Sequence, residues 1–310
     1  MKNLSRNIIT TLLTIVPMVS IASEKPDFGN IRVVIGSKST GGDTYQAASI
    51  ITQALSEKLG INAKVDAVGT IPGYSILQRD KGGHTIMVTH DQSYIGTLYG
   101  TKGYVDMFEN FKMGPIFATN PANAYLVPKS SKFKTLENVI DAAGNGEKVT
   151  VAIQPGSVSE IGYSAIRNAV KLKYPGMEEN LVAVNTGSQE AKNQLLFDGL
   201  ADVIHGSLPA NEQYTHFPET DQKAMRFLWL TAKKSTIDTI NTNGFGKLSK
   251  EEINSYAEPM VTVPIDEQAN FTFDKEFFIL YSKNTPNDKI AYIDKALKEI
   301  YSENKIKNTM

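Results

Sequence analysis

Two stretches of the chain repeat one order of features: a short apolar run, a loop with glycine and hydroxyl residues, and a segment with helical spacing. In the first stretch, "IRVVI" is followed by "SKSTGGDT" (37–44) and by a helical pattern that ends at Leu59. In the second, "VTVAI" is followed by "QPGSVSE" (154–160) and by a helical pattern that ends near residue 172. Each stretch predicts a buried strand, a loop and a helix, the building unit of an α/β fold. We call these two loops the first loop and the second loop.

Further apolar runs predict the remaining strands, and the length of 310 residues is enough for two compact lobes. We expect one lobe from residues 23–127 plus 230–310, and a second lobe from residues 128–229. The additional predicted strands cover residues 62–68, 84–89, 123–131, 181–184, 201–206, 226–231 and 276–282.

The N-terminus has the pattern of a secretory signal peptide. Lys2 and Arg6 precede an uncharged, mostly apolar stretch, and Ser20 and Ala22 provide the small residues of a cleavage site. The apolar stretch is about 12 residues long, whereas a membrane-spanning helix needs roughly 20. We therefore expect cleavage of residues 1–22 and export to the periplasm. The chain contains no cysteine, so disulfides and thiol chemistry are excluded.

The two loops are candidate anion sites, because a helix N-terminus carries unpaired N–H groups and a partial positive charge. Gly41 and Gly42 would let a ligand approach the backbone of the first loop. Local structure offers an alternative account of both loops: Asp43 caps the first helix, and Ser157 with Glu160 forms a capping box on the second.

Motifs of several enzyme and nucleotide-binding classes are missing: G-x-G-x-x-G, G-x-x-x-x-G-K-[ST], G-x-S-x-G and H-E-x-x-H. His90 and His205 end predicted strands, where they either reach a cleft or are satisfied by backbone groups. No histidine has metal-ligand spacing with another. We expect no cofactor and no metal. The balance of 32 Lys and Arg against 33 Asp and Glu gives no basic surface for nucleic acid.

Several segments, in order, resemble the substrate-binding receptors of tripartite tricarboxylate transporters, the Bug (TctC-like) family. The similarity extends over roughly residues 30 to 300, and the order and spacing of its segments are more specific than any one of them. The segments are "IRVVIGSKSTGGDTYQAASIITQALSEKLG", "PGYSILQ", "HTIMVT", "KTLENVI", "VTVAIQPGSVSEIGYSAI", "VAVNTGSQEAKNQLLFDGLADVI" and "RFLWLTA".

The resemblance implies a periplasmic binding protein with a type II-like two-lobe fold, in which each lobe is a mixed sheet flanked by helices. Such a protein is not an enzyme; it closes on a small organic anion, a mono-, di- or tricarboxylate, and delivers it to the permease subunits of a membrane transporter. A monomer is expected. By position, the resemblance implies these ligand-binding residues: Ser39, Thr40, Gly41, Gly42, Asp43, Thr44, Tyr45, Thr89, His90, Pro155, Gly156, Ser157, Val158, Ser159 and His205.

The first loop departs from the family pattern Pro-Gly-Gly-Gly-x-Asp. Thr40 replaces the proline, Asp43 the third glycine and Tyr45 the aspartate. A carboxylate beside a carboxylate site repels the ligand unless it is protonated or a cation lies between them. We hypothesise that Asp43 and Tyr45 shift specificity toward a ligand with a hydroxyl or amino group as well as a carboxylate.

Two other functions are compatible with the sequence. A ligand sensor of the same fold would dock a signalling receptor instead of a permease. A secreted hydrolase would use His90 or His205 with a serine and an acidic residue, and would require nucleophile and base within hydrogen-bond reach. For the receptor, we expect lobe closure about hinges near residues 125–129 and 228–233.

Overall fold

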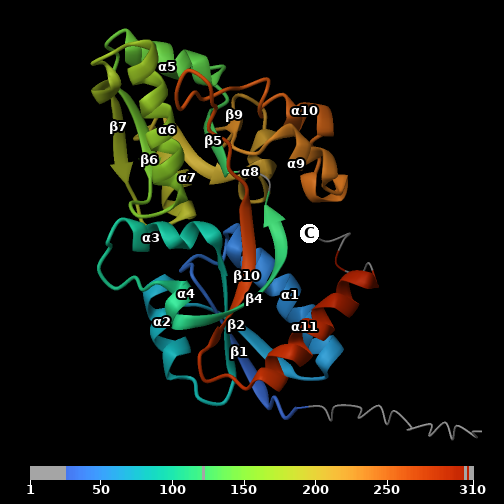
Figure 1. Cartoon of the computed structure of the whole chain (residues 1–310). Helices are drawn as coiled ribbons and strands as arrows, with labels where there is room; N and C mark the ends of the chain where they lie inside the picture. Colours follow the sequence, from blue (N-terminus) through green and yellow to red (C-terminus); the bar gives the residue numbers. More distant parts are fainter. Residues whose placement is uncertain (1–25, 121–122, 304–305, 307–310) are drawn as a thin grey trace, which may run out of the picture.

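The computed structural model describes residues 26–120, 123–303 and 306, and it consists of two lobes, each built on one five-stranded sheet (Figure 1). The strand order is β2-β1-β3-β10-β4 in the first lobe and β7-β6-β8-β5-β9 in the second. The strands are β1 (Asn30–Ile35), β2 (Asn62–Ala67), β3 (Thr85–His90), β4 (Phe111–Asn120), β5 (Asn123–Pro128), β6 (Val149–Ile153), β7 (Leu181–Asn185), β8 (Val203–Ser207), β9 (Met225–Leu230) and β10 (Lys275–Ser282).

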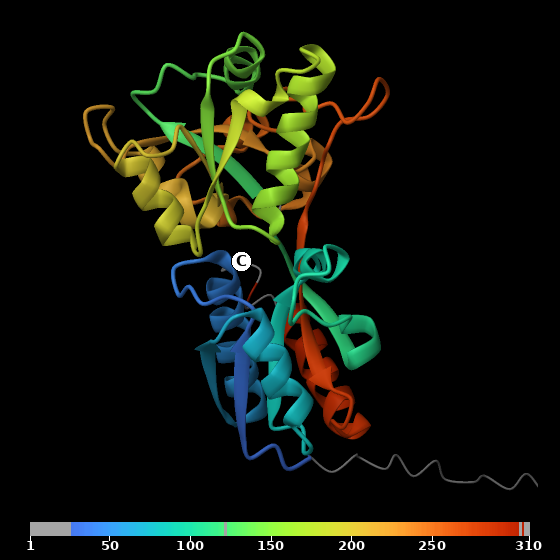
Figure 2. The same cartoon turned by 90° about the vertical axis from the view of Figure 1, so that its left-hand side faces the viewer.

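Helices cover both faces of each sheet, as Figure 2 shows from the side. The α-helices are α1 (Asp43–Leu59), α2 (Thr70–Arg79), α3 (Ile95–Leu98), α4 (Met107–Asn110), α5 (Leu136–Gly144), α6 (Val158–Lys173), α7 (Gln189–Phe197), α8 (Leu208–Thr215), α9 (Lys234–Thr239), α10 (Lys250–Asn254) and α11 (Asn287–Ser302). Short 3-10 helices are η1 (Asp91–Tyr94), η2 (Glu178–Asn180) and η3 (Thr242–Phe245).

The first lobe places β1 between β2 and β3 in parallel, with β10 antiparallel to β3 and β4. Alternate residues of β1 enter opposite cores: Val33 and Ile35 pack with α1 and α11, whereas Val34 packs with α2. A strand buried on both faces needs a continuous apolar run, which explains "IRVVI". The expected mixed α/β sheets are confirmed in both lobes.

The second lobe repeats the arrangement, with β6 parallel to β7 and β8, and β5 antiparallel to β8 and β9. Its sheet is covered by α5 and α6 on one face. On the other face lie α7, α8, α9 and α10.

The chain crosses between the lobes at other positions than the sequence led us to expect. We expected the first crossing after residue 127, but β5 pairs with β8 and β9 and so belongs to the second sheet. We expected the return at residue 230, but residues 231–274 stay on the second lobe, where Ile237 and Ile253 enter its core. The cause is that an apolar run predicts a strand without indicating which sheet it joins.

The hinges expected near residues 125–129 and 228–233 therefore fall on strands of the second lobe. The backbone next to the crossings is tied together: Thr231 donates to the carbonyl of Asn123 at 2.9 Å, and Phe273 donates to the carbonyl of Thr231 at 2.8 Å. The chain passes between the lobes after β4 and into β10, two strands that pair in the first sheet and lie side by side in Figure 1.

The strand β4 is absent from the sequence prediction, because Gly114 and Pro115 interrupt its pattern. The structure accommodates both residues at the edge of the sheet, where the register of β4 against β10 shifts. A Cβ atom on Gly114 would lie 2.9 Å from the carbonyl oxygen of Ile279, so the close approach requires glycine.

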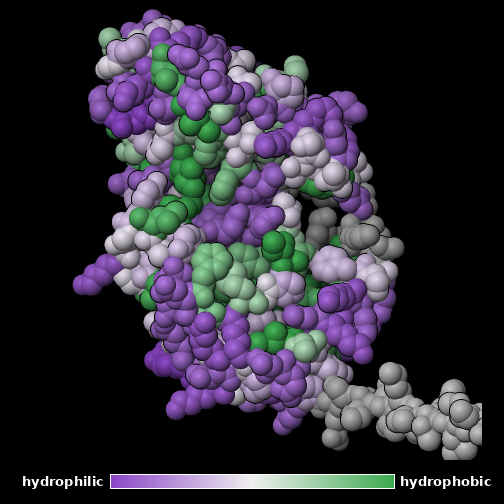
Figure 3. All heavy atoms as spheres, viewed as in Figure 1, coloured by the Kyte–Doolittle hydropathy of each residue, from purple (hydrophilic) through white to green (hydrophobic). Residues whose placement is uncertain are grey.

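Within the part of the chain that is described, no helix has the length and apolar character needed to cross a membrane. The predicted signal peptide, residues 1–22, lies outside the described residues. Figure 3 shows a mainly hydrophilic surface in this view, with apolar side chains in smaller groups around the junction of the lobes.

Candidate functional site

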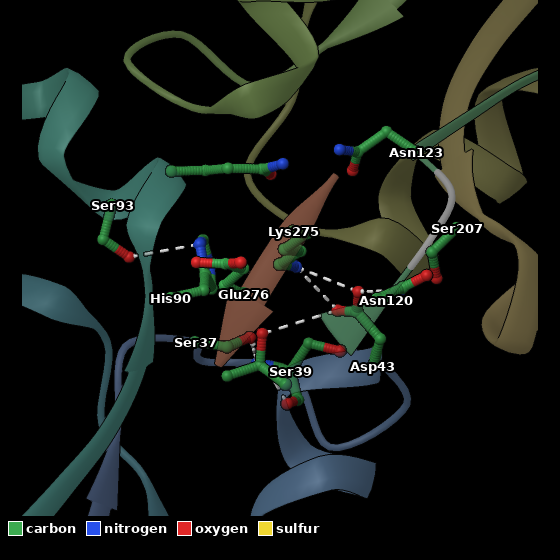
Figure 4. A network of polar contacts seen from close by, with 12 residues as sticks. Ser37, Ser39, Asp43, His90, Ser93, Asn120, Asn123, Ser207, Lys275 and Glu276 are labelled. Atoms are coloured by element: carbon green, nitrogen blue, oxygen red, sulfur yellow. Dashed lines mark hydrogen bonds and ion pairs between the residues drawn. The ribbon is translucent and has the colours of Figure 1, made fainter. Parts of the chain in front are cut away.

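A cavity of about 480 Å³ lies between the two lobes and is lined by both. The first lobe contributes residues of the first loop, the start of α2 and His90, and the second lobe contributes residues of the second loop, the start of α7 and the end of β8. Asn123 and Lys275, next to the two crossings, complete the lining. In the close view of Figure 4, Lys275 extends from β10 toward Asp43 and Asn120.

The Asp43 carboxylate, which the sequence left without a partner, forms a buried ion pair with Lys275. The Lys275 ammonium lies 3.0 and 2.9 Å from its two oxygens, and the Asn120 side-chain amide donates to one of them at 2.8 Å. Burial alone would raise the pKa of Asp43, but the charge and hydrogen bonds of Lys275 hold this pKa below its usual value. Asp43 is therefore ionised, and the positive charge of Lys275 balances its negative charge. The helix α1 begins after Gly42, whose extended backbone provides no side-chain cap.

The first loop also contacts the second lobe directly. The Ser39 hydroxyl and the Gly41 N–H both donate to the Glu190 carboxylate at the start of α7, the latter at 3.3 Å. Burial opposes ionisation of Glu190, but hydrogen bonds from Ser39, Ser188 and backbone N–H groups together outweigh it and lower the pKa of this carboxyl. One backbone donor of the first loop is thus occupied by a carboxylate of the protein itself.

The hydrogen-bonding groups of the second loop find partners among residues of the loop itself. Ser157 is the N-cap of α6, and its hydroxyl accepts from the Ser159 N–H at 3.3 Å. The Glu160 carboxylate accepts from Gly156 at 2.6 Å, one residue earlier than a capping box on Ser157 requires, so the expected box is wrong in this detail. The Ser159 hydroxyl accepts from the Gln154 N–H at 2.7 Å. Gly156 has φ +70°, a conformation that favours glycine.

Lys192 on α7 is a buried cation that lines the cavity and has no acidic partner among the described residues. Its side chain is buried in the second lobe, and the residue is only 4% exposed. Its ammonium lies 3.0 Å from Nδ1 of His205, whose Nε2 lies 3.3 Å from the Asn123 side-chain oxygen. Burial, together with the charge of Lys275, lowers the pKa of Lys192 to about 7. Burial and the charge of Lys192 hold the pKa of His205 well below its usual range, so this imidazole is neutral.

His90 lies at the end of β3 beside the Asp43–Lys275 pair. Its Nδ1 is 3.5 Å from the Ser93 hydroxyl, which itself accepts from Thr89 at 3.0 Å. Burial and the charge of Lys275 keep the pKa of His90 well below its usual value. The Ser93 contact is long, and within the described residues no carboxylate bonds to the His90 ring, so the arrangement lacks the orienting acid of a catalytic triad. No cluster of three or more metal-ligating His, Asp or Glu side chains occurs in that part of the chain either.

The structure brings ten of the fifteen residues implied by the resemblance to the cavity wall. These ten are Ser39, Gly42, Asp43, Thr44, His90, Pro155, Gly156, Ser157, Val158 and His205. The cavity lining does not include Thr40, Gly41, Tyr45, Thr89 or Ser159.

Physical reasons account for most of these five exceptions. Tyr45 packs against the core of the first lobe and is not part of the cavity lining. Thr89 and Ser159 are fully buried and hydrogen-bonded within their own lobes. Gly41 faces Glu190.

Sequence reasoning missed the two lysines that determine the charge of the site. Lys192 lies in the polar segment "EAKNQ", which reads as the exposed face of a helix, and Lys275 begins a strand after an irregular region. Lys192 lies in the first turn of α7, and Lys275 is the first residue of β10. Both positions are close to the lobe junction. Only the pairing of distant elements reveals that these residues face a cavity.

The fold and the site geometry define a class: the chain has the two-lobe fold of periplasmic solute-binding proteins. Over 90% of its length it is similar to MatC from Rhodopseudomonas palustris with bound malate, with 14% identity, 88% of that chain covered and a TM-score of 0.64. It is similar to R. palustris Rpa4515 with adipate at 17% identity, with 86% of this chain and 82% of that chain covered and a TM-score of 0.65.

A third solved structure is the periplasmic binding protein BugD, with 13% identity, 91% of this chain and 87% of that chain covered and a TM-score of 0.59. These likenesses confirm the resemblance to Bug- and TctC-type proteins at the level of the fold. No protein-family model and no curated protein matches the chain.

Proposed function

We propose that this protein is a periplasmic solute-binding protein that captures a small organic carboxylate between its lobes and delivers it to the permease subunits of a tripartite tricarboxylate-type transporter. The observation that carries the proposal is Lys192, a buried cation on the wall of the interlobe cavity with no acidic partner among the described residues. A buried charge is costly unless an opposite charge accompanies it, so the cavity favours an anion.

Neighbouring groups suit the same ligand. The N-terminus of α6 opens at the cavity through Ser157 and Val158, and a helix N-terminus stabilises negative charge. His205, which contacts the Lys192 ammonium, and Asn123, which contacts His205, are neutral polar groups that do not compete with a carboxylate for this charge. Malate and adipate, named with two of the fold neighbours, belong to the same chemical class.

The lining from both lobes supports a specific mode of capture. A ligand held by Lys192 in the second lobe and by residues of the first loop bridges the lobes, so its binding favours the closed arrangement. A permease that recognises only the closed form would then receive loaded receptor.

A thermal-shift screen of residues 23–310 tests the capture step with mono-, di- and tricarboxylates, amino acids and neutral sugars. We expect carboxylates to raise the melting temperature, since a ligand at 100 times its Kd adds about 2.7 kcal/mol to the stability of the folded state. Stabilisation by neutral sugars alone would contradict the proposal. Uptake of the identified carboxylate by cells with and without this protein tests the delivery step.

A further inference from the structure

The charges on the cavity wall carry a more specific inference about the ligand, and it rests on the proposed function. Four Lys or Asp side chains line the cavity: Lys38, Asp43, Lys192 and Lys275. Asp43 and Lys275 neutralise each other in an ion pair whose side chains are 13% and 7% exposed. Lys38 is exposed, and its aliphatic carbons lie beside Gly69 at the rim. Lys192 is thus the one uncompensated buried cation of the described wall.

The other ionisable groups near the cavity do not add a second positive charge. His205 is buried and His90 is partly buried, and the pKa of each imidazole lies well below its usual range, so both are neutral. Glu190, at the start of α7, is engaged by Ser39 and Gly41. A ligand with two carboxylates would place its second negative charge where the described wall has no second buried, unpaired cation. An ammonium group would find both nearby carboxylates already paired.

A second, independent observation concerns the uncharged part of the ligand. Gln92 lines the cavity and is 1% exposed, and its side-chain oxygen has no hydrogen-bond partner within the described part of the chain. The amide orientation is fixed because its nitrogen donates to the Asp274 carbonyl at 3.4 Å. A buried acceptor without a partner costs free energy, so a ligand that donates a hydrogen bond to it gains affinity. A carboxylate cannot donate this bond, whereas a hydroxyl or an amide can.

We propose that the cavity selects a monocarboxylate whose remaining part is neutral and carries a hydroxyl or amide donor. The carboxylate pairs with Lys192, and the neutral donor bonds to the Gln92 oxygen. Polar, uncharged residues that line the same cavity suit such a ligand: Ser37, Thr70, Ser93, Asn123, Gln154 and Ser207.

Calorimetric titration of the wild-type protein with matched pairs of ligands tests this proposal without any substitution. Succinamate and succinate, and adipamate and adipate, differ only in an amide that replaces one carboxylate. In whichever of the two pairs binds more tightly, we expect the protein's affinity for the monoamide to be at least tenfold higher than its affinity for the dicarboxylate. Equal affinity, preference for the dicarboxylate, or tighter binding of an α-amino acid would overturn the proposal and leave the proposed function standing. Absence of binding by every carboxylate in the panel would overturn both.

The variant Asp43→Asn provides a second test, because it leaves Lys275 as an additional unpaired cation. We expect it to increase affinity for the dicarboxylate at least tenfold relative to the monoamide. In the control Asp43→Asn/Lys275→Met, the second cation is gone, and the preference for the monoamide should return. An unchanged ratio in Asp43→Asn, with its folding verified by circular dichroism, would contradict the charge argument.

Discussion

The two loops at the carboxyl ends of β1 and β6 look alike in the sequence but are stabilised in different ways. The second loop uses its own residues: Ser157 caps α6, and Glu160 returns to the Gly156 N–H. The first loop has no side-chain cap, and besides local bonds among Ser37, Ser39 and Gly41 it depends on groups from far along the chain, Lys275 on β10 and Glu190 on α7. The first loop therefore depends on the correct placement of both lobes, whereas the second loop is a local structure.

This difference indicates where binding and closure are controlled. Contacts within one loop persist whether the lobes are open or closed. The Ser39 and Gly41 contacts with Glu190 connect the lobes, so separation of the lobes would break them. The contacts of the first loop thus depend on how close the lobes are, whereas the second loop offers a preformed helix N-terminus.

The largest effect on stability is expected when Lys275, the cation that pairs with Asp43 of the first loop, is removed. Lys275→Met leaves the Asp43 carboxylate buried beside Asn120 with no ionic partner, and such a change lowers the free energy of unfolding by roughly 3–5 kcal/mol. Urea denaturation measures the loss. Asp43→Asn/Lys275→Met serves as the control and should recover most of it. If Lys275→Met alone unfolds at the wild-type midpoint, the ion pair does not stabilise this loop.

The charge of the second lobe should respond to pH, whereas the paired charge of the first loop should not. The groups around Lys192 are His205 on β8, Lys275 on β10, Asp43 on α1 and Glu190 on its own helix. Because its pKa is about 7, Lys192 loses its proton as pH rises, and carboxylate affinity should fall up to tenfold per pH unit above 7. Titration calorimetry at pH 6 to 9 checks this, and a constant affinity contradicts it.

The same pKa determines how the free protein responds to pH. Lys192 has a folded-state pKa of about 7 and an ordinary pKa of 10.5, so between these pH values the unfolded state binds more protons. Stability of the ligand-free protein therefore gains a contribution as pH rises from 7 toward 10.5. Lys192→Met should remove this contribution, which thermal melts of both proteins can measure.

A smaller effect is expected when the second loop loses its local cap. Ser157→Ala removes the acceptor of the Ser159 N–H and should lower the free energy of unfolding by about 1 kcal/mol. Because the loss is local, it should be the same with and without ligand. A substitution to threonine keeps the hydroxyl and is the matched control. A loss that grows with ligand concentration would instead assign Ser157 a role in ligand binding.

The smallest effect is expected at the contact between the lobes. Glu190 is exposed, and its hydrogen bonds to Ser39 and Gly41 should contribute about 0.2–1 kcal/mol to closure. Glu190→Ala should raise the ligand dissociation rate a few-fold and increase the radius of gyration in small-angle scattering, with Glu190→Gln intermediate. Unchanged values of both quantities in Glu190→Ala would show that the contact does not hold the lobes together.

Local patterns predicted much of the fold and part of the site. The runs "IRVVI" and "VTVAI" indicated β1 and β6 because strands buried on both faces need continuous apolar sequence. The N-cap at Ser157 was also predicted from a local pattern. The strand β4 was missed, since Gly114 and Pro115 break its pattern and are tolerated only at a sheet edge.

Long-range pairing accounts for the features that the sequence did not reveal. The charge balance of the cavity depends on Asp43 meeting Lys275, which is 232 positions away. The hypothesis that Tyr45 adjusts specificity receives no support from its position, since this side chain packs against the core of the first lobe. A lysine in a polar helical segment such as Lys192 reads as exposed until the tertiary structure buries it.

The most direct test of the account is titration calorimetry of the wild-type protein and Lys192→Met with the carboxylate that gives the largest thermal shift. Lys171→Met, which removes an exposed lysine from α6, controls for the loss of one positive charge. We predict that Lys192→Met reduces affinity at least a hundredfold while Lys171→Met binds as the wild type does. Equal affinity of the wild type and Lys192→Met would show that this buried cation does not hold the ligand's carboxylate.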